Sequence, residues 1–365
     1  MIRIIHGADF HLDSPFSGLS PDQAARRRGE QRELLGRMAQ AARERAADLV
    51  LLAGDLLDSE RVFQETAQAL ARALGDIPCP VFLSPGNHDF WSPRSVYATL
   101  DWPENVHIFR EPRMTALELP ELRAVVHGAA FTAPEQAESL LTGFAAPADG
   151  QVHLGVLHGE IDPAENRYDP LGKAEIAASG LAYLALGHIH KRTEPLRFGN
   201  TVCAWPGCPE GRGFDELGEK GFYQGTVTDG GQVELAFVPF ARHRYEILEV
   251  DVTGKTPREA VEAALPPDTA RDLYRIILTG ETGEAGAGAE GLQEALADRF
   301  YALEIRDRTR VAEDIWARAE EDSLRGLFLR ELRQKLAAAQ SDEEREEVTR
   351  AVRFGLAALD HRDLG

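Results

Sequence analysis

Residues 2–11 read Ile-Arg-Ile-Ile-His-Gly-Ala-Asp-Phe-His, an apolar run that leads directly into the triplet Asp9-Phe10-His11. The run 2–5 has the length and aliphatic character of a buried strand. Carboxylate and imidazole groups directly after such a strand predict a functional site at its carboxyl end, where the crevice of an open α/β sheet lies. The same arrangement recurs four more times before residue 191.

The other four strands are predicted from the apolar runs 49–53, 81–84, 152–157 and 183–186. Each run ends in a turn that carries acids, an amide or histidines. These turns are Gly54-Asp55, Gly86-Asn87-His88-Asp89, His158-Gly159 and Gly187-His188-Ile189-His190. Because every turn follows a strand, we expect their side chains to converge at one edge of the sheet.

Two helices are predicted between these strands. In the segment 21–47, Pro21 stands where a first helical turn would begin, and Leu34 and Met38 recur at helical spacing. The segment 62–74 places its apolar residues on one face in the same way. The alternation of strands and helices favours an α/β layered architecture.

The residue types in the five turns predict a metal site. Carboxylate, amide oxygen and imidazole together suit Mn²⁺, Fe²⁺ or Zn²⁺, and the set is too rich in nitrogen for Ca²⁺ or Mg²⁺ alone. There is enough ligand for two ions, with one carboxylate between them. Two ions about 3.5–4 Å apart can share a hydroxide, lower its pKa toward neutrality and stabilise the attacking and leaving oxygens at phosphorus. The glycines beside the ligands allow sharp turns and close backbone approach.

Each turn taken alone also fits a plainer interpretation, because an Asp or His after a strand is often a turn residue or a satisfied core group. Five such turns in succession, each at the end of a strand, favour the metal site. The other histidines are interpreted as structural or surface residues: His6, His107, His127, His153, His243 and His361.

The series of five turns resembles the signature of the calcineurin-like metallophosphoesterases. Within them it most resembles the bacterial DNA-repair exonuclease branch, the SbcD-like and YhaO-like proteins. Residues 6–16, the stretch Ala204-Trp-Pro-Gly207 with Gly221-Phe222 after it, and the amphipathic C-terminal segment are similar to that branch. Asp13 stands where glycine is commoner after His-Leu, which is expected in the YhaO-like proteins. The resemblance implies a four-layer α/β/β/α sandwich with a small α+β capping domain and a C-terminal helical tail.

The resemblance also implies a role for each residue. One ion would be held by Asp9, His11, Asp55 and His190. The other would be held by Asp55, Asn87, His158 and His188, with Asp55 as the bridge. His88 would bind no metal; it would face the phosphate and stabilise the transition state or protonate the leaving oxygen. Two divalent ions are implied, with Mn²⁺ expected and Fe²⁺ or Zn²⁺ as alternatives.

The chain is predicted to have three parts. Residues 1–243 form the phosphoesterase domain, which ends in a β-hairpin over 221–240 whose Asp-Gly-Gly centre suits a tight turn. Residues 244–310 form a small α+β capping domain with strands at 246–252 and 274–279 and a helix that begins near Thr256. Residues 311–365 read as helices, with Ser341 as the N-cap of the last one.

The bulk composition limits the class of protein. The 365 residues include 40 basic and 60 acidic side chains, a net charge of −20, which argues against a surface built wholly for nucleic acid but leaves room for a local basic groove. No apolar run reaches the length that crosses a bilayer, and no signal peptide is expected. Three cysteines without zinc-like spacing predict no disulfide framework, so a cytoplasmic location is expected.

Other segments suggest partners. Arg26-Arg27-Arg28 is interpreted as a solvated helix face in preference to a DNA contact, and Tyr168, Arg192 and Arg212 are candidates for a substrate groove. The amphipathic C-terminal helices either pack on each other or dock onto a partner. The resemblance implies an SMC-like coiled-coil ATPase as that partner, a homodimer through the catalytic domain, and DNA as the substrate. No phosphate-binding Gly-x-x-x-x-Gly-Lys-Ser/Thr loop occurs in the chain, so ATP-driven steps would need the second protein.

The sequence is compatible with three functions. The first is a DNA nuclease, most simply an exonuclease, that acts in DNA repair with an ATPase. The second is a phosphodiesterase or phosphatase for a small molecule, which the acidic balance favours but which does not account for the segment after residue 243. The third is an inactive interaction module, against which the complete set of eight site residues counts.

Overall fold

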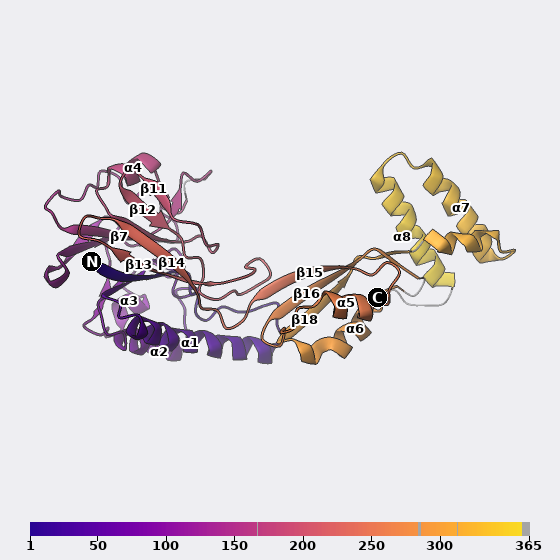
Figure 1. Ribbon diagram of the computed structural model, residues 1–365, viewed down its shortest axis with the longest axis horizontal. Coiled ribbons are helices and arrows are strands. Elements are labelled where there is room, and N and C mark those ends of the chain that lie inside the picture. The colour runs from indigo at the N-terminus through magenta and orange to yellow at the C-terminus, as the bar shows by residue number, and fades with distance from the viewer. Residues whose placement is uncertain (166, 284–285, 312, 360–365) are drawn as a thin grey trace. The chain divides into compact units, whose positions relative to one another are not determined.

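The computed structural model describes residues 1–165, 167–283, 286–311 and 313–359. The chain divides into two compact units, Met1–Arg242 and His243–Gly365 (Figure 1). The five turns that carry the predicted ligands all lie in the first unit, which is built around two six-stranded sheets.

The first sheet has the strand order β14-β13-β1-β2-β3-β4. Strands β1 to β4 are parallel, and β13 and β14 extend the sheet in antiparallel pairing beside β1. The strands are β1 (Ile2–Gly7), β2 (Leu49–Leu52), β3 (Val81–Leu83), β4 (Val106–Ile108), β13 (Gly221–Val227) and β14 (Val233–Pro239). The β13–β14 pair confirms the hairpin predicted over 221–240.

The second sheet has the strand order β11-β12-β10-β7-β6-β5. Its four central strands are parallel, and an antiparallel strand closes each edge. The strands are β5 (Thr115–Leu119), β6 (Ala124–Gly128), β7 (Val152–His158), β10 (Tyr183–Gly187), β11 (Leu196–Phe198) and β12 (Thr201–Ala204). A short pair, β8 (Glu160–Ile161) and β9 (Pro170–Leu171), lies apart from this sheet.

The two sheets pack face to face between helices, so the first unit has four layers. One buried cluster holds side chains from both sheets, among them Ile4 and Leu51 of the first and Val156 of the second. The outer face of the first sheet packs on α1 (Pro21–Glu44) and α2 (Gln64–Gly75), and the outer face of the second packs on α4 (Lys173–Ala178) (Figure 1). The short helices α3 (Val96–Thr99) and η1 (Pro120–Leu122) lie in the connections. The predicted α/β/β/α sandwich is confirmed.

Helix α1 begins where its sequence provides a complete N-terminal cap. The hydroxyl of Ser20 accepts from the backbone N–H of Gln23, the Gln23 side chain accepts from the N–H of Ser20, and Pro21 fills the first helical position. The apolar residues of the helix, such as Leu34 and Met38, are buried against the first sheet. Local capping and apolar spacing therefore agree, and the predicted helix is confirmed.

The prediction that Arg26, Arg27 and Arg28 form a solvated helix face is wrong for Arg27 of α1. Its side chain is fully buried, and Nη1 lies 2.5 Å from Glu210 and 3.0 Å from Glu30. Arg26, one position earlier, is exposed as expected. The helical period turns Arg27 inward to a carboxylate that arrives from a distant loop, and this pairing makes its burial tolerable.

The second unit contains a parallel three-stranded sheet of order β15-β16-β18. These strands are β15 (Tyr245–Asp251), β16 (Leu273–Thr279) and β18 (Ala302–Asp307), and they pack with α5 (Pro257–Ala264) and α6 (Ala289–Leu296) around one apolar cluster. The predicted helix near Thr256 is confirmed, with Thr256 as its cap. Strand β18 was not predicted. The short turn η2 (Ala297–Arg299) and the pair β17 (Glu281–Thr282) and β19 (Arg310–Val311) complete this part.

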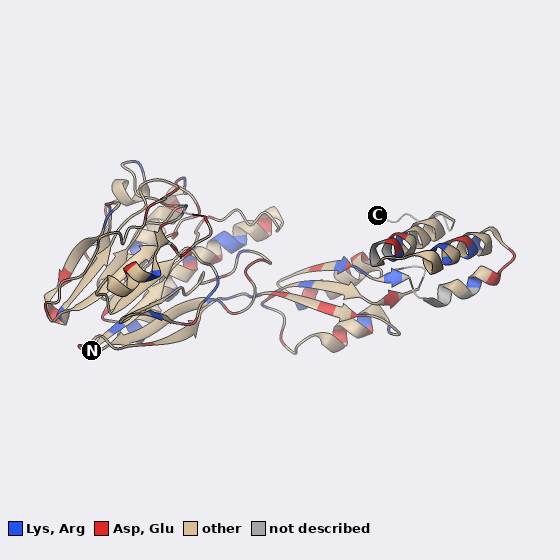
Figure 2. Ribbon diagram, turned by 90° about the horizontal axis from the view of Figure 1, so that it is seen from above, with Lys and Arg blue, Asp and Glu red and all other residues tan. Residues whose placement is uncertain are grey.

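The chain ends in η3 (Glu313–Glu320), α7 (Leu324–Ala338) and α8 (Asp342–Leu359), which share a small apolar cluster that includes Leu329 and Leu356. The hydroxyl of Ser341 accepts from the N–H of Glu344, as expected for an N-cap. Basic and acidic residues are interspersed along both units (Figure 2). Among the described residues, no helix is both long and apolar enough to cross a bilayer. The three-part division of the chain stays a prediction.

Candidate metal centre

The structure brings all eight predicted site residues to the carboxyl ends of five strands. Asp9 follows β1, Asp55 follows β2, and Asn87 and His88 follow β3 in the first sheet. His158 is the last residue of β7 and His188 follows β10 in the second sheet, where Gly187 and His158 are direct neighbours in register. Since the two sheets lie face to face, both contribute side chains to the same buried edge.

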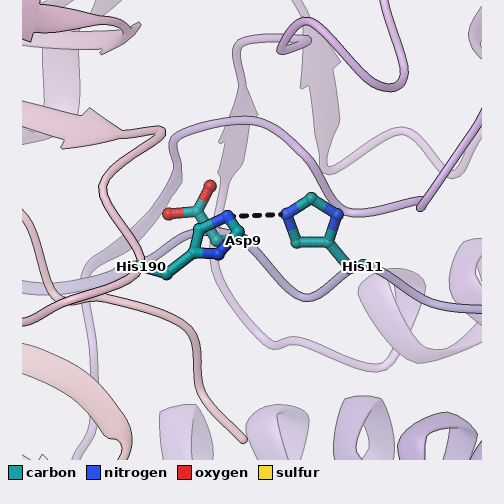
Figure 3. Close-up of side chains that lie close together, drawn as sticks. All are labelled: Asp9, His11 and His190. Carbon is teal, nitrogen blue, oxygen red and sulfur yellow. Dashed lines mark hydrogen bonds between the residues drawn. The ribbon is translucent and has the colours of Figure 1, made fainter. Parts of the chain in front are cut away.

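One group of donors is formed by Asp9, His11 and His190 (Figure 3). The Nε2 atoms of His11 and His190 lie 3.0 Å apart, and the ligand atoms of all three residues lie within 4.8 Å of one another. Asp9 and His11 are fully buried. We name this group the first position. Two imidazole nitrogens that face each other beside a carboxylate form a donor set suited to a divalent transition metal.

A second group is formed by Asn87, His158 and His188. The side-chain oxygen of Asn87 lies 2.9 Å from Nε2 of His158 and 3.2 Å from Nδ1 of His188. Nδ1 of His158 lies 2.9 Å from the carbonyl oxygen of Ala53, so it carries a proton, and Nε2 is the nitrogen that would give its electron pair to an ion after losing its own proton. We name this group the second position. Amide oxygen and two imidazole nitrogens again suit a transition metal.

Asp55 lies between the two positions. Its Oδ2 is 3.4 Å from Nε2 of His158 in the second position and 3.6 Å from Nε2 of His11 in the first. Its Oδ1 accepts from the backbone N–H of His88 at 2.9 Å, which fixes the carboxylate plane. One oxygen is therefore directed to both donor sets, as a bridging ligand requires. The residues present fit two divalent ions.

His88 is exposed, unlike the donors around it. Its Nδ1 lies 2.9 Å from the carbonyl oxygen of Asp58, and its ring meets the ring of His11 edge-on at 4.8 Å. The carbonyl holds the Nδ1 proton, so Nε2 is the nitrogen available to a substrate. The position suits proton transfer at the rim of the site.

The backbone around the donors is unusual in ways that the sequence motifs explain. Asp9, His11, Asp55 and His188 all have positive φ values, 56°, 43°, 49° and 94°, which side chains other than glycine seldom adopt. A Cβ on Gly187 would lie 1.7 Å from the carbonyl oxygen of Ala53, so only glycine fits there. Strained backbone of this kind is common at functional sites.

Burial and close charges shift the pKa values of the donors. Burial raises the pKa of Asp9 to about 6 and lowers that of His11 to about 4 and that of His188 to about 3. Burial would lower the pKa of His158 as well, but the adjacent Asp55 carboxylate overrides it and raises the value to about 9. The neutral imidazoles of His11 and His188 are the protonation state that a metal ligand needs.

Three charged residues lie behind the first position. Glu216 and Asp58 were not predicted as site residues, and Arg212 was predicted only as a candidate for a substrate groove. Glu216 lies 2.7 Å from Nδ1 of His190, and Asp58 lies 3.2 Å from Nδ1 of His11. Arg212, considered above for a substrate groove, contacts both of these carboxylates. Asp58 had a signal in its place three residues after Asp55 in a motif turn, whereas nothing in the sequence around Glu216 indicated its role.

Two further residues connect the turns. Oδ1 and Oδ2 of Asp89 accept backbone N–H bonds from Gly86 at 2.8 Å and Leu56 at 2.7 Å, so this last residue of the third motif supports the turns after β2 and β3. The indole N–H of Trp205 lies within hydrogen-bond distance of the carbonyls of Gly159, at 3.1 Å, and Gly187, at 3.0 Å. Trp205 belongs to the stretch 204–207 that resembles the DNA-repair branch, but only the structure shows that it connects two of the turns.

This arrangement of sheets and donors defines a class of protein. The sequence pattern of the calcineurin-like phosphoesterases matches residues 2–192, so the chain belongs to that family. The family binds divalent metals and hydrolyses phosphoester bonds, and the His and Asp clusters agree with this chemistry.

Particular relatives are similar over longer stretches. The metallophosphoesterase YhaO of Bacillus subtilis is 33% identical over 267 residues, which cover 69% of this chain and 64% of YhaO. The DNA double-strand break repair protein Mre11 of Methanopyrus kandleri is 24% identical over 86% of this chain and 72% of its own length. The SbcD component of the nuclease SbcCD of Bacillus subtilis is 25% identical over 60% of this chain and 64% of its own length. The predicted resemblance to SbcD-like and YhaO-like proteins is confirmed.

Proposed function

We propose that this protein is a metal-dependent phosphodiesterase that cleaves DNA, most simply as an exonuclease in DNA repair. The observation that carries the proposal is the place of Asp55, whose Oδ2 lies between the imidazoles of His11 and His158. A carboxylate shared by two donor sets would hold two ions close together, as in the two-metal hydrolysis of phosphodiesters.

In this proposal the first ion is held by Asp9, His11, Asp55 and His190, and the second by Asp55, Asn87, His158 and His188. The ions, with Mn²⁺ expected, would supply Lewis acidity and generate a nucleophile from water at neutral pH. His88 would stabilise the charge on phosphorus or give a proton to the leaving oxygen through Nε2, since its Nδ1 is engaged by the carbonyl of Asp58.

The choice of DNA rests on the relatives and on the size of the chain. The relatives include a component of a nuclease and a DNA double-strand break repair protein. The unit His243–Gly365 adds a sheet and two long helices beyond the catalytic unit, which hydrolysis of a small ester does not require. The net charge of −20 favours a small substrate instead, so the test below includes one.

The test is hydrolysis of end-labelled linear DNA in Mn²⁺, with bis-p-nitrophenyl phosphate as the parallel substrate. Asp55→Ala and His88→Ala should abolish both reactions, and His107→Gln, on strand β4, should retain them. A ladder of shortened DNA that both site variants lose would support the nuclease. Hydrolysis of the small ester with intact DNA would reject the DNA proposal and favour the small-molecule alternative. No hydrolysis of either substrate would reject the site assignment.

We also propose that α7 and α8 bind an SMC-like coiled-coil ATPase. The support is a set of apolar side chains left exposed on these helices: Leu324 is 70% exposed, Leu327 52% and Phe354 60%. Exposed apolar residues on a helix pair suit packing against another helix. Co-elution with an SMC-type ATPase in gel filtration should be lost in the Leu327→Asp, Phe354→Asp double variant. The resemblance also implies a homodimer. The molar mass of the chain alone, measured by light scattering during gel filtration, tests this.

A further inference from the structure

Two carboxylates and a guanidinium form a closed ring of contacts with the two imidazoles of the first position. Oε1 of Glu216 is 2.7 Å from Nδ1 of His190 and 2.7 Å from Nη2 of Arg212. Nη1 of Arg212 is 3.0 Å from Oδ1 of Asp58, and the same oxygen is 3.2 Å from Nδ1 of His11. The Nε2 atoms of His11 and His190 also face each other, and this last contact closes the ring.

The ring is sheltered from solvent and rigid. The side chain of Glu216 is 4% exposed, that of Arg212 20% and that of Asp58 23%. The backbone N–H of Arg212 also donates to the second oxygen of Glu216, at 2.8 Å. A guanidinium is planar and presents its donors in a fixed fork, so the orientation of one carboxylate determines that of the other. The hydroxyl of Ser14 gives Asp58 a further bond at 3.0 Å.

The second position is supported differently. Nδ1 of His158 is held by a backbone carbonyl, and Nε2 of His188 is held by Glu160, whose side chain is 31% exposed. Within the described part of the chain, no salt bridge joins Glu160 to an arginine or lysine. The two imidazoles of this position are thus held separately, whereas those of the first position share one support.

We propose that Asp58, Arg212 and Glu216 are positioning residues that act as one unit on the first position. They hold the His11 and His190 rings with their Nε2 atoms directed at the ion: Glu216 bonds Nδ1 of His190, and the Asp58 carboxylate lies beside Nδ1 of His11. Loss of any one of them weakens metal binding at the first position and leaves the second nearly unchanged. The inference rests on the proposed function only in taking the two donor groups as metal positions.

A role of Arg212 as a charge and a role as a positioning group predict opposite changes in metal affinity when Arg212 is lost, so the two roles can be distinguished. If Arg212 acted only as a positive charge, its removal would raise the affinity for a cation by reducing repulsion. If it acts by position, its loss lowers affinity, and partners of this kind typically contribute a factor of about 10–100. Arg212→Lys keeps the charge and loses the fork, so it isolates the geometric effect.

The experiment is calorimetric titration of metal-free full-length protein with Mn²⁺, without DNA. His190→Ala and His188→Ala first identify the binding events of the first and second positions. Glu216→Gln, Asp58→Asn and Arg212→Lys should then each weaken the first event about 10–100-fold and change the second by less than about twofold. Glu160→Gln should do the reverse, and Arg197→Lys on β11 is the matched control that should alter neither.

Coupling within the ring gives a second readout. Because the three residues act as one unit, the Arg212→Lys, Glu216→Gln double variant should lose little more affinity than the worse single variant. Thermal unfolding of each metal-free variant identifies the variants that fold. If Asp58→Asn does not fold, Arg212→Lys still tests the inference. Wild-type affinity in folded Arg212→Lys, or an equal loss at both positions, would overturn the inference. DNA cleavage is not measured, so failure of the nuclease proposal would leave this result intact.

Discussion

The hydroxyl of Tyr97 donates a hydrogen bond of 2.6 Å to Oδ2 of Asp89, and both side chains are buried in the first unit. Asp89 in turn accepts from the backbone N–H groups of the turns that carry Asp55 and Asn87. The Tyr97 phenol is therefore connected through Asp89 to the turns of both candidate metal positions.

Tyr97→Phe should lower the free energy of unfolding by about 1.5–3 kcal/mol, because it removes a hydrogen bond to a buried charged acceptor. The turn that carries Asp55 should loosen as a result, so Mn²⁺ affinity should fall as well. Urea unfolding and metal titration measure the two effects. An unchanged stability would mean that Asp89 finds another donor without loss.

Gly187→Ala should abolish activity and destabilise the protein strongly, because the added Cβ would lie 1.7 Å from the carbonyl oxygen of Ala53. Gly36→Ala is the matched control. Its Cβ would meet no atom within 4 Å, and in the interior of α1 the change should stabilise by about 0.5–1 kcal/mol. Thermal unfolding compares the pair, and similar behaviour of the two variants would contradict the close packing at Gly187.

Removal of metal should lower the melting temperature of the wild-type protein. A ligand at 100 times its Kd stabilises the folded state by about 2.7 kcal/mol, and EDTA would withdraw that contribution. Asp55→Ala should lose most of the response, since Asp55 contacts both donor groups. Differential scanning fluorimetry with Mn²⁺, Fe²⁺ and Zn²⁺ would also rank the metals, and an EDTA effect of wild-type size in the variant would count against the bridge.

Arg27→Met should destabilise the protein by about 3–5 kcal/mol, because it leaves a buried carboxylate, Glu210, without its cation. Arg26→Met, one position earlier, is a fitting control, since that side chain is 69% exposed. Exposed pairs contribute about 0–1 kcal/mol, so the control should change little. Chemical denaturation of both variants decides whether burial of the pair sets the difference.

Asp169→Asn should change how stability depends on pH. Burial raises the pKa of Asp169 to about 8 from its ordinary value of 3.8. Between these values the unfolded chain has lost the proton and the folded chain keeps it, so stability falls as pH rises, by about 1.4 kcal/mol per unit. Asparagine does not titrate, and it tolerates the positive φ of 48° at this position.

The variant should therefore match the wild type near pH 4 and exceed it progressively up to about pH 8, above which the difference stays constant. Denaturation at a series of pH values measures this directly. Parallel curves for the two proteins would mean that Asp169 is already ionised in the folded state.

The layered α/β architecture and the clustering of the eight side chains were predictable from the sequence because both depend on local signals, whereas the four-layer sandwich was implied by the family resemblance. An apolar run such as 49–53 predicts a buried strand, and topology places the residues after parallel strands at one edge. Residues that act through contacts between distant loops gave no such signal. Arg212 meets Asp58 only after the two sheets pack, and Glu210 reaches Arg27 from far along the chain. The mixed polarity of 302–307 likewise concealed strand β18.

The pairing of His11 with His190 joins positions separated by 179 residues along the chain. During synthesis from the N-terminus, Asp9 and His11 leave the ribosome long before their partner, and the supporting Glu216 follows later still. A partly made chain therefore lacks the complete set of residues at the first position. The set is complete only when the first unit, which ends at Arg242, is nearly finished. The fold thus delays assembly of the candidate site until the unit that encloses it has been made.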